Sequence, residues 1–295
     1  MRRPFLLYDA DRGFCAASTK QCHWGQNAPW RNKLQDSRSL SISDLLALTF
    51  AATVLAVFEL LHYAEFPPAG GRFLTALGIT VGFALLAWFA GGVSVTGALA
   101  GSAVAFIMAV RDLRMFLALL IVFAVTLGAT RVGYARKQQL RVAEPSGGRT
   151  AAQAMANLGI AALLVAVAPA GWPVIALAAL AEAAADTSSS EIGMAFPGKT
   201  VLITNLKSTP AGTDGGISLV GTMAACGGAI MVAAAALLSS LVSLPQAVII
   251  VLAGFLGTMV DSLLGSLFER RGWLDNDLVN LFSTAAAAGM AWILA

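Results

Sequence analysis

The segment LRMFLALLIVFAVTLGATR, residues 113–131, is a continuous apolar run with an arginine near each end. A membrane-spanning α-helix needs roughly 20 mainly apolar residues, and this segment has about that length. Apolar and polar residues do not alternate along it, as they would in a strand of a membrane barrel. Because an α-helix satisfies its backbone hydrogen bonds internally, the run predicts a transmembrane helix.

Eight other segments have the same character. Of the 295 residues, 58% are hydrophobic and 12% are charged, whereas soluble domains have about 25% charged residues. We therefore predict an all-α, polytopic transmembrane helix bundle. The nine candidate spans are residues 43–62, 73–90, 93–110, 113–131, 151–168, 172–186, 217–242, 245–266 and 278–295. Short or polar segments such as 93–110 and 172–186 are candidates for re-entrant or broken helices, which would reduce the count to seven or eight.

Residues 1–40 are polar, and no apolar core of a secretory signal follows their basic start. We expect a cytoplasmic tail here and a single integral membrane domain over residues 41–295. The three cysteines form neither an even set nor a paired cluster, which argues against a disulfide framework or a zinc site. The sequence gives no support for nucleic-acid binding.

The basic residues indicate the orientation. With the N-terminus in the cytoplasm, the nine spans place 16 lysines and arginines on the cytoplasmic face and three, Arg72, Arg111 and Arg114, on the other. Cytoplasmic loops carry an excess of basic residues, so this asymmetry supports that orientation. Since no targeting signal is visible, we expect the bacterial inner (cytoplasmic) membrane.

Carboxylates gather in AEAAADTSSSEIG, residues 181–193, where Glu182, Asp186 and Glu191 lie at the end of a candidate span. Carboxylates at membrane depth are costly and usually face the bundle interior or a water-filled cavity. Glu182 and Asp186 are four residues apart and share a helical face, so their like charges require a cation or a proton between them. The alternative is two carboxylates solvated at a helix end.

A glycine-rich loop follows in FPGKTVLITNLKSTPAGTDGGIS, residues 196–218, with a short extended piece at 201–204. We expect its run GTDGG to open the next helix, whose N-terminal amides attract anions. Phosphate binding and simple turn-and-cap chemistry remain open as alternatives. The candidate phosphate contacts are Lys207, Gly212, Thr213, Gly215 and Gly216.

Two later segments carry further polar groups. Asp261 lies near the cytoplasmic end of a span, on the same side as Asp186, where an unpaired charge is costly. Asp275, Asn276 and Asn280 precede or begin the last span. Their oxygens suit Mg²⁺, which takes one or two carboxylates together with substrate phosphates. An N-cap by Asp275 or Asn276 is a compatible alternative.

Arg149, Gln153 and Asn157 form a polar stripe at the start of an otherwise apolar span. The stripe predicts either hydrogen bonds between helices or a cavity reached from the cytoplasm, with Arg149 holding phosphate at its mouth. All four polar clusters open to the cytoplasmic face. Their convergence predicts a site for a charged ligand beside the lipid phase.

At these residues the chain resembles the DUF92 family of integral membrane proteins, which includes transmembrane protein 19 and the phytyl-phosphate kinase of plants. The match runs in family order across about residues 145–295. Its pieces are the Arg149/Gln153/Asn157 helix start, ADTSSSEIG (185–193), LIT (202–204), PAGTDGGIS (210–218), VDSLLG (260–265) and LDNDLVNLFS (274–283). The ADT segment is also similar to a motif of CTP-dependent lipid kinases.

The resemblance implies an integral membrane fold and transfer of a phosphoryl group from a nucleoside triphosphate, CTP by preference, to an isoprenyl monophosphate. Carried onto matching positions, it makes Asp186, Glu191, Asp261 and Asp275 candidate metal or nucleotide contacts, with 212–216 around phosphate.

Our leading hypothesis is a membrane kinase that uses CTP or ATP and Mg²⁺ to convert an isoprenyl or phytyl monophosphate to the diphosphate. Asp186, Glu191 and Asp261 are its catalytic candidates, and Asp186, Asp261 and Asp275 its metal ligands. Gln153, Asn157 and Glu182 would line the substrate cavity, with Asn276 and Asn280 beside the nucleotide. The alternative is a transporter or lipid-translocating protein whose carboxylates bind ions or protons. A third possibility is a membrane assembly protein without turnover.

Overall fold

The computed structural model describes residues 40–62, 65, 70–143, 147–196 and 198–295, so the predicted tail lies almost entirely outside the described residues. Its elements are α2 (Ile42–His62), α3 (Gly71–Phe89), α4 (Val95–Arg111), α5 (Leu113–Arg131), α6 (Tyr134–Leu140), α7 (Ala151–Val167), α8 (Trp172–Ala195), β1 (Thr200–Leu202), β2 (Ser208–Thr209), β3 (Gly216–Ser218), α9 (Leu219–Leu238), α10 (Leu244–Leu267), the 3-10 helix η1 (Glu269–Arg271) and α11 (Asn276–Leu294).

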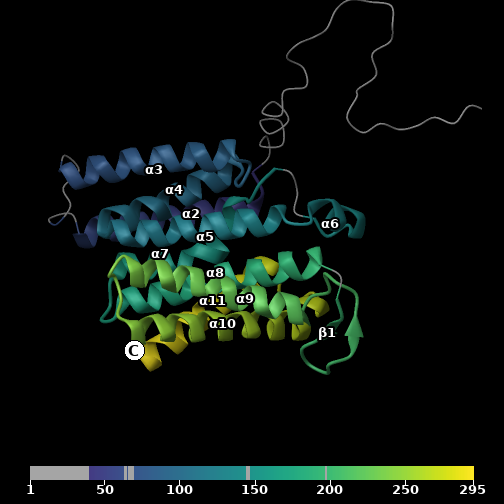
Figure 1. Ribbon diagram of the computed structural model, residues 1–295. Coiled ribbons are helices and arrows are strands. Elements are labelled where there is room, and N and C mark those ends of the chain that lie inside the picture. Colours follow the sequence, from purple (N-terminus) through teal and green to yellow (C-terminus); the bar gives the residue numbers. More distant parts are fainter. Residues whose placement is uncertain (1–39, 63–64, 66–69, 144–146, 197) are drawn as a thin grey trace, which may run out of the picture.

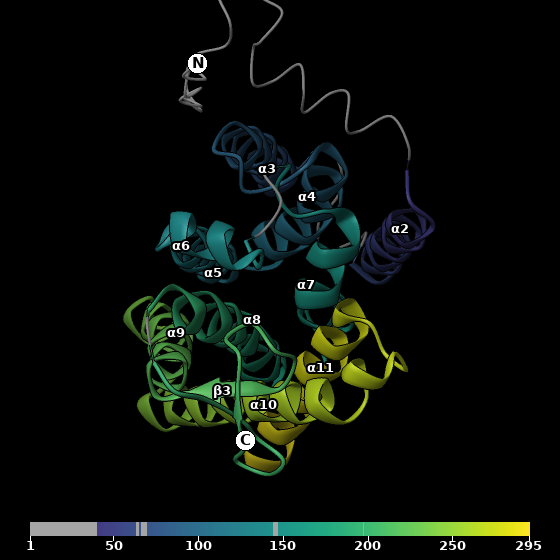
Figure 2. The same cartoon turned by 90° about the vertical axis from the view of Figure 1, so that its right-hand side faces the viewer.

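The long helices lie side by side with their axes roughly aligned, and the short strands extend from one end of this bundle (Figure 1). Viewed along the helix axes, α2 to α7 form one group and α8 to α11 a second group beside it (Figure 2). Each of the nine predicted spans coincides with one of the long helices. The all-α membrane class predicted from the sequence is therefore supported.

The predicted number of spans is not confirmed. Within the described residues, six helices are long and apolar enough to cross a membrane: α2, α3, α5, α9, α10 with η1, and α11. The apolar helices α4 and α7 are each 17 residues long. They fall short of the roughly 20 residues that a full crossing needs. The outward faces of the spans carry exposed leucines such as Leu60, Leu86 and Leu238, which suits contact with lipid.

Helix α8 lies at the centre of the bundle and packs against α5, α7, α9, α10 and α11. Its first half is buried on every side. Neighbouring helices approach it at glycines. A Cβ atom added at Gly228 would lie 2.7 Å from the carbonyl oxygen of Ala184, and one added at Gly254 would lie 2.8 Å from the Cβ of Ala181. Small residues thus allow close packing around α8.

Two local predictions need correction. Helix α8 does not end near residue 186 but continues to Ala195. Ser188 Oγ donates to the carbonyl of Ala184 at 2.7 Å and Ser190 Oγ to that of Asp186 at 3.1 Å, so these two hydroxyl groups are satisfied within the helix. The glycine-rich run also does not open α9. Residues 216–218 instead pair with β1, and α9 begins after Ser218, whose Oγ accepts a hydrogen bond from Gly221 N at 3.1 Å.

The predicted extended piece is β1, which is the central strand of a small antiparallel sheet with the order β2–β1–β3. Thr200 pairs with Thr209 on one side and with Ser218 on the other. The sheet connects α8 to α9 at the end of the bundle that carries the predicted polar clusters (Figure 1). It therefore holds the glycine-rich loop over that end.

Candidate functional site

A cavity of about 410 Å³, called the polar cavity below, opens at this end of the bundle. Its wall comes from the start of α7, the second half of α8, the 211–218 loop, α10, η1 and the start of α11. The predicted site residues that line it are Arg149, Gln153, Asn157, Asp186, Glu191, Gly212, Thr213, Gly215, Gly216, Asp261, Asn276 and Asn280. The convergence of the four clusters predicted from the sequence is thus present in the structure.

Two carboxyl groups from different helices meet in this cavity. Asp186 of α8 and Asp261 of α10 lie within hydrogen-bonding range of each other. Ser283 of α11 donates a hydrogen bond from its Oγ to Asp261 Oδ2 at 3.2 Å. Two carboxylates in contact repel unless a cation or a proton lies between them. The pair is therefore suited to bind a cation.

Glu182 lies one helical turn before Asp186 and shares its face, as predicted, but it does not line the polar cavity. Its side chain is 1% exposed. Its Oε1 has no hydrogen-bond partner among the described residues, and a Cβ atom added at Gly257 would lie 2.6 Å from its Cγ. Glu182 therefore lies beneath the carboxyl pair, packed against α10.

Arg149, just before α7, lines the same cavity as the carboxyl pair. Its guanidinium group donates a hydrogen bond to Thr187 Oγ1 at 3.2 Å, and its charge acts directly on Asp186. Its backbone is fixed by hydrogen bonds with the segment before α4, from Arg149 N to Gly92 O at 3.1 Å and from Ser94 N to Arg149 O at 2.9 Å. The positive charge is thus held in place at the cavity wall.

The other two residues of the polar stripe also serve α7 itself. Gln153 Oε1 accepts a hydrogen bond from Thr150 N at 2.9 Å and completes a capping box with Thr150. Asn157 Nδ2 donates to the carbonyl of Gln153 at 2.9 Å. Both line the cavity as predicted, and within the part of the chain that the structure describes neither side chain makes the hydrogen bond between helices that was the alternative interpretation.

Glu191 has a structural partner that the sequence did not suggest. Lys137 of α6 is completely buried, and its Nζ forms an ion pair with Glu191 Oε2. The same ammonium group donates to the carbonyls of Ala129 at 3.2 Å and Thr130 at 2.7 Å. Three acceptors satisfy its three protons. Glu191 thus joins α6 to α8 while also forming part of the cavity wall.

The glycine-rich loop forms one wall of the polar cavity. Gly215 has a left-handed backbone with φ of 71°, and an added Cβ atom would lie 2.5 Å from the carbonyl oxygen of Ser262 in α10. Only glycine fits so close to the helix backbone. The loop therefore lies directly on α10 beside Asp261.

Besides Glu182, two predicted residues lie outside the cavity wall. Asp275 caps α11, because its Oδ1 accepts a hydrogen bond from Leu278 N at 2.9 Å, as the compatible alternative proposed. Lys207 is exposed between β1 and β2.

The sequence interpretation missed Glu269, which lines the cavity and acts electrostatically on Asp261. Its neighbours Arg270 and Arg271 made that segment read as a basic loop.

The donor set fits a hard cation that completes its shell with substrate oxygens. Within the described residues, no group of three or more His, Cys, Asp or Glu side chains is placed to hold a metal ion. Asp186 and Asp261 supply two adjacent carboxylates. Mg²⁺ is commonly bound by one or two carboxylates together with phosphate oxygens and water. The site therefore suits Mg²⁺ that arrives with a phosphate ligand.

Comparisons with known proteins agree with the membrane character of the chain. The family described as integral membrane protein DUF92 matches residues 78–288. An uncharacterized membrane protein of Synechocystis sp. is 30% identical over 187 residues, covering 60% of this chain and 72% of that protein. An uncharacterized membrane protein of Methanocaldococcus jannaschii is 35% identical over 162 residues, covering 52% and 65%. The chloroplastic protein VTE6 of Arabidopsis thaliana is 33% identical over 112 residues, covering 37% and 34%. No solved structure matches the chain.

Proposed function

The chain belongs to the DUF92 family of integral membrane proteins, and we propose that it transfers a phosphoryl group from CTP or ATP to an isoprenyl monophosphate such as phytyl phosphate. The observation that carries this proposal is the polar cavity, which gathers the Asp186–Asp261 pair, Arg149 and the 212–216 loop at one end of the bundle. Phosphoryl transfer depends mainly on positioning and charge stabilisation, which such groups supply.

The chemistry needs no protein nucleophile. A phosphate monoester has a second pKa of about 6 and is largely a dianion at neutral pH. One of its oxygens attacks the γ-phosphorus, and a new O–P bond forms. The bond from that phosphorus to the bridging oxygen of the β-phosphate breaks, and its electron pair leaves with the nucleoside diphosphate. Because the attacking oxygen carries no proton, no general base is required.

The residues then have distinct roles. Asp186 and Asp261 would hold Mg²⁺, which neutralises phosphate charge when it is bound. The planar guanidinium group of Arg149 suits bidentate binding of a phosphate. The backbone of the 212–216 loop lies close enough to the carboxyl pair to contact the triphosphate.

An enzyme is favoured over a transporter by the position of the cavity. Among the described residues, those lining the polar cavity all come from one end of the bundle, and none comes from the loops around Asp112, Gly171 or Ser240 at the other end. A transport path would have to reach both faces. We propose that the cavity faces the cytoplasm from a bacterial inner membrane, where nucleotide is present.

The test is a phosphorylation assay with the purified full chain. It is incubated with CTP or ATP, Mg²⁺ and phytyl or geranylgeranyl monophosphate, and the prenyl diphosphate is measured. We expect product with wild type and none above background with Asp186→Asn. Glu65→Gln, an exposed change at the other end of the bundle, should keep wild-type activity.

Absence of diphosphate with every pair of substrates would overturn the kinase proposal. A proteoliposome flux assay on the same preparation tests the alternative. Flux that depends on Asp186, without any diphosphate formation, would identify a transporter instead.

A further inference from the structure

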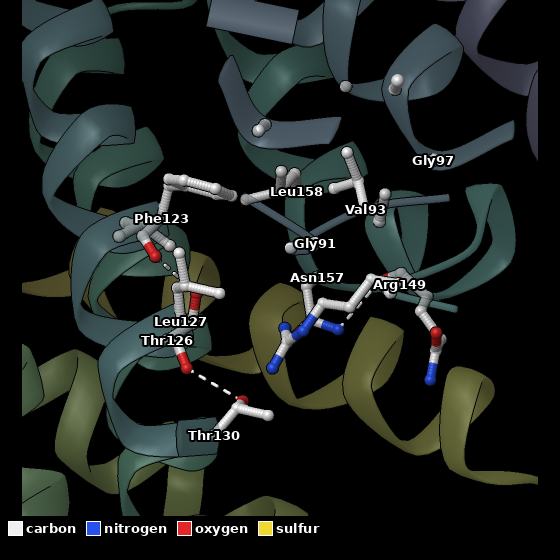
Figure 3. Close-up of a pocket in the computed structure, with 18 of the residues that line it drawn as sticks. Gly91, Val93, Gly97, Phe123, Thr126, Leu127, Thr130, Arg149, Asn157 and Leu158 are labelled. Atoms are coloured by element: carbon white, nitrogen blue, oxygen red, sulfur yellow. Dashed lines mark hydrogen bonds between the residues drawn. The ribbon is translucent and has the colours of Figure 1, made fainter. Parts of the chain in front are cut away.

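A second cavity lies beside the polar cavity and has the opposite character. It encloses about 310 Å³ between α3, α4, α5 and α7, and we call it the apolar cavity. Its volume is at the lower end of the range of about 300–1,000 Å³ that is typical of small-molecule sites. Phe123 of α5, Leu158 of α7 and Gly97 of α4 line it (Figure 3). Gly101 of α4 is also part of its wall.

Three hydroxyl groups in this wall are already bonded to the backbone. Thr130 Oγ1 donates to the carbonyl of Thr126 at 2.9 Å, and Thr126 Oγ1 donates to that of Phe123 at 3.2 Å. Ser102 Oγ donates to the carbonyl of Ala98 at 2.7 Å. The wall therefore favours a hydrocarbon ligand over water, since a buried water needs two to four polar partners.

Among the described residues, the two cavities share three, Arg149, Gln153 and Asn157. Figure 3 shows Arg149 and Asn157 beside the space that Phe123 and Leu158 line. A ligand that fills both spaces must have an apolar part on one side of this boundary and a polar part on the other, and the guanidinium group of Arg149 at the boundary favours a negative charge on that polar part. Such a ligand is an amphiphile with a negatively charged head group.

We propose that the apolar cavity holds the hydrocarbon tail of the phosphate acceptor, with its phosphate at Arg149. The inference rests on the proposed function and assigns the two phosphate-binding groups to different substrates. Arg149, at the boundary, takes the lipid phosphate. The 212–216 loop, which lines the polar cavity and not the apolar cavity, takes the nucleotide.

Gly101 gives a direct test, because a Cβ atom added there meets nothing within 4 Å although the residue lines the apolar cavity. Gly101→Leu therefore fills the cavity without a clash at the backbone. Gly78→Leu is the matched control, since Gly78 has equally open space on the exposed face of α3. Binding of geranylgeranyl monophosphate and of dimethylallyl monophosphate is measured by calorimetry with the purified full chain, without nucleotide.

We expect Gly101→Leu to weaken binding of the long-chain phosphate by about tenfold or more, because several methylene groups lose their buried contacts. The short-chain phosphate should bind as it does to wild type, and Gly78→Leu should change neither. Should Gly101→Leu unfold, Gly101→Ala replaces it, with an expected loss of about threefold for one displaced methylene.

Unchanged long-chain binding by the folded Gly101 variant would overturn the tail site. So would equal losses for the long and the short phosphate. The kinase proposal and the tail-site proposal can be overturned independently of each other. Binding that depends on Gly101 without diphosphate formation would remove the kinase and leave the tail site. If Gly101→Leu forms the diphosphate as efficiently as wild type, the tail site is excluded and the kinase proposal stands.

Discussion

At the residue scale, the contact between Asp186 and Asp261 is the feature with the clearest chemical consequence. Two half-buried carboxylates that meet from different helices repel each other, which points to a functional role for the pair. Asp261→Asn removes one charge and keeps the shape of the side chain. We expect the turnover of prenyl monophosphate to fall by about a hundredfold or more, comparable to the loss of one electrostatic group in other active sites.

The melting temperature of Asp261→Asn in detergent should be equal to or above that of wild type, because the repulsion is gone. A variant that keeps wild-type kcat/KM would exclude Asp261 from the reaction. Higher Mg²⁺ should partly restore the activity if the lost charge served to bind the metal.

Asp112, outside the spans, provides a prediction on stability. It caps α5 by accepting a hydrogen bond from Arg114 N at 2.9 Å, and its side chain pairs with the guanidinium group of Arg114. Burial acts to raise the pKa of Asp112, but the hydrogen bonds from the Arg114 side chain and backbone outweigh it and lower the pKa below the usual 3.8. Asp112→Ala should cost about 1 kcal/mol at neutral pH.

The lowered pKa of Asp112 determines how its contribution to stability depends on pH. A lowered pKa in the folded state means that the carboxylate stabilises the protein above pH 3.8, and that this contribution is lost as the pH falls through the folded pKa. The difference in melting temperature between wild type and Asp112→Ala should therefore shrink below pH 3.8. Asp112→Asn is the control, since asparagine also caps helices. A difference that is constant from pH 7 to pH 3 would contradict this explanation.

Individual site residues were predictable where a charged side chain, which is energetically costly at membrane depth, interrupts an apolar run. Asp186 and Asp261 stand out for that reason. Lys137 did not, because a lysine in a basic loop normally reports orientation, and its burial against Glu191 depends on how α6 folds back onto α8. Contacts of this kind are set by tertiary packing and leave no local pattern.

At the element scale, the contact of α4 with the start of α7 positions Arg149. A Cβ atom added at Gly97 would lie 2.0 Å from the carbonyl oxygen of Arg149. A backbone oxygen cannot turn away as a flexible side chain can. Gly97→Ala should therefore destabilise the protein by about 1–3 kcal/mol through overpacking and displace Arg149 from the cavity.

The measurement is thermal unfolding in detergent, together with the phosphorylation assay. Gly101→Ala, one turn further along α4, has open space at its Cβ and should unfold at or above the wild-type temperature. Equal melting temperatures for Gly97→Ala and Gly101→Ala would show that the two helices can separate without cost.

The attachment of α6 to α8 depends on the Lys137–Glu191 ion pair. Removing one partner leaves the other charge buried, which typically costs about 3–5 kcal/mol. We expect Lys137→Ala and Glu191→Ala each to destabilise strongly and the double variant to destabilise by less than their sum. A double-mutant cycle measures this difference. Gln138→Ala, on the exposed face of α6, is the control, and strict additivity would contradict the coupling.

The sequence predicted the long elements well, because continuous apolar runs leave few alternatives to helices. All nine runs are helical in the structure. The ends were less predictable. The serines after Asp186 resemble a loop, yet they continue α8 by bonding to its carbonyls. The 216–218 segment resembles a helix start, yet it pairs with β1 across a long loop.

At the scale of the whole molecule, the groups of the candidate site are confined to one end of the bundle. The polar cavity, the small sheet and η1 lie at one end. Arg114 and Asp112 lie at the other, where Arg114 also donates to the carbonyl of Ser240 at 3.0 Å. Sixteen of the 19 lysines and arginines belong to segments that the nine-span topology assigns to the cytoplasm. The end with the polar cavity should therefore face the cytoplasm.

This orientation is testable with single cysteines placed at the two ends in a variant that lacks the native cysteines. Lys207→Cys lies between β1 and β2, and Ser240→Cys lies between α9 and α10. In intact cells, a membrane-impermeant thiol reagent should label Ser240→Cys, and it should reach Lys207→Cys only after the membrane is permeabilised. The reverse pattern would turn the polar cavity away from the nucleotide pool. Since a kinase must take its nucleotide from the cytoplasm, that single result would also remove the proposed activity.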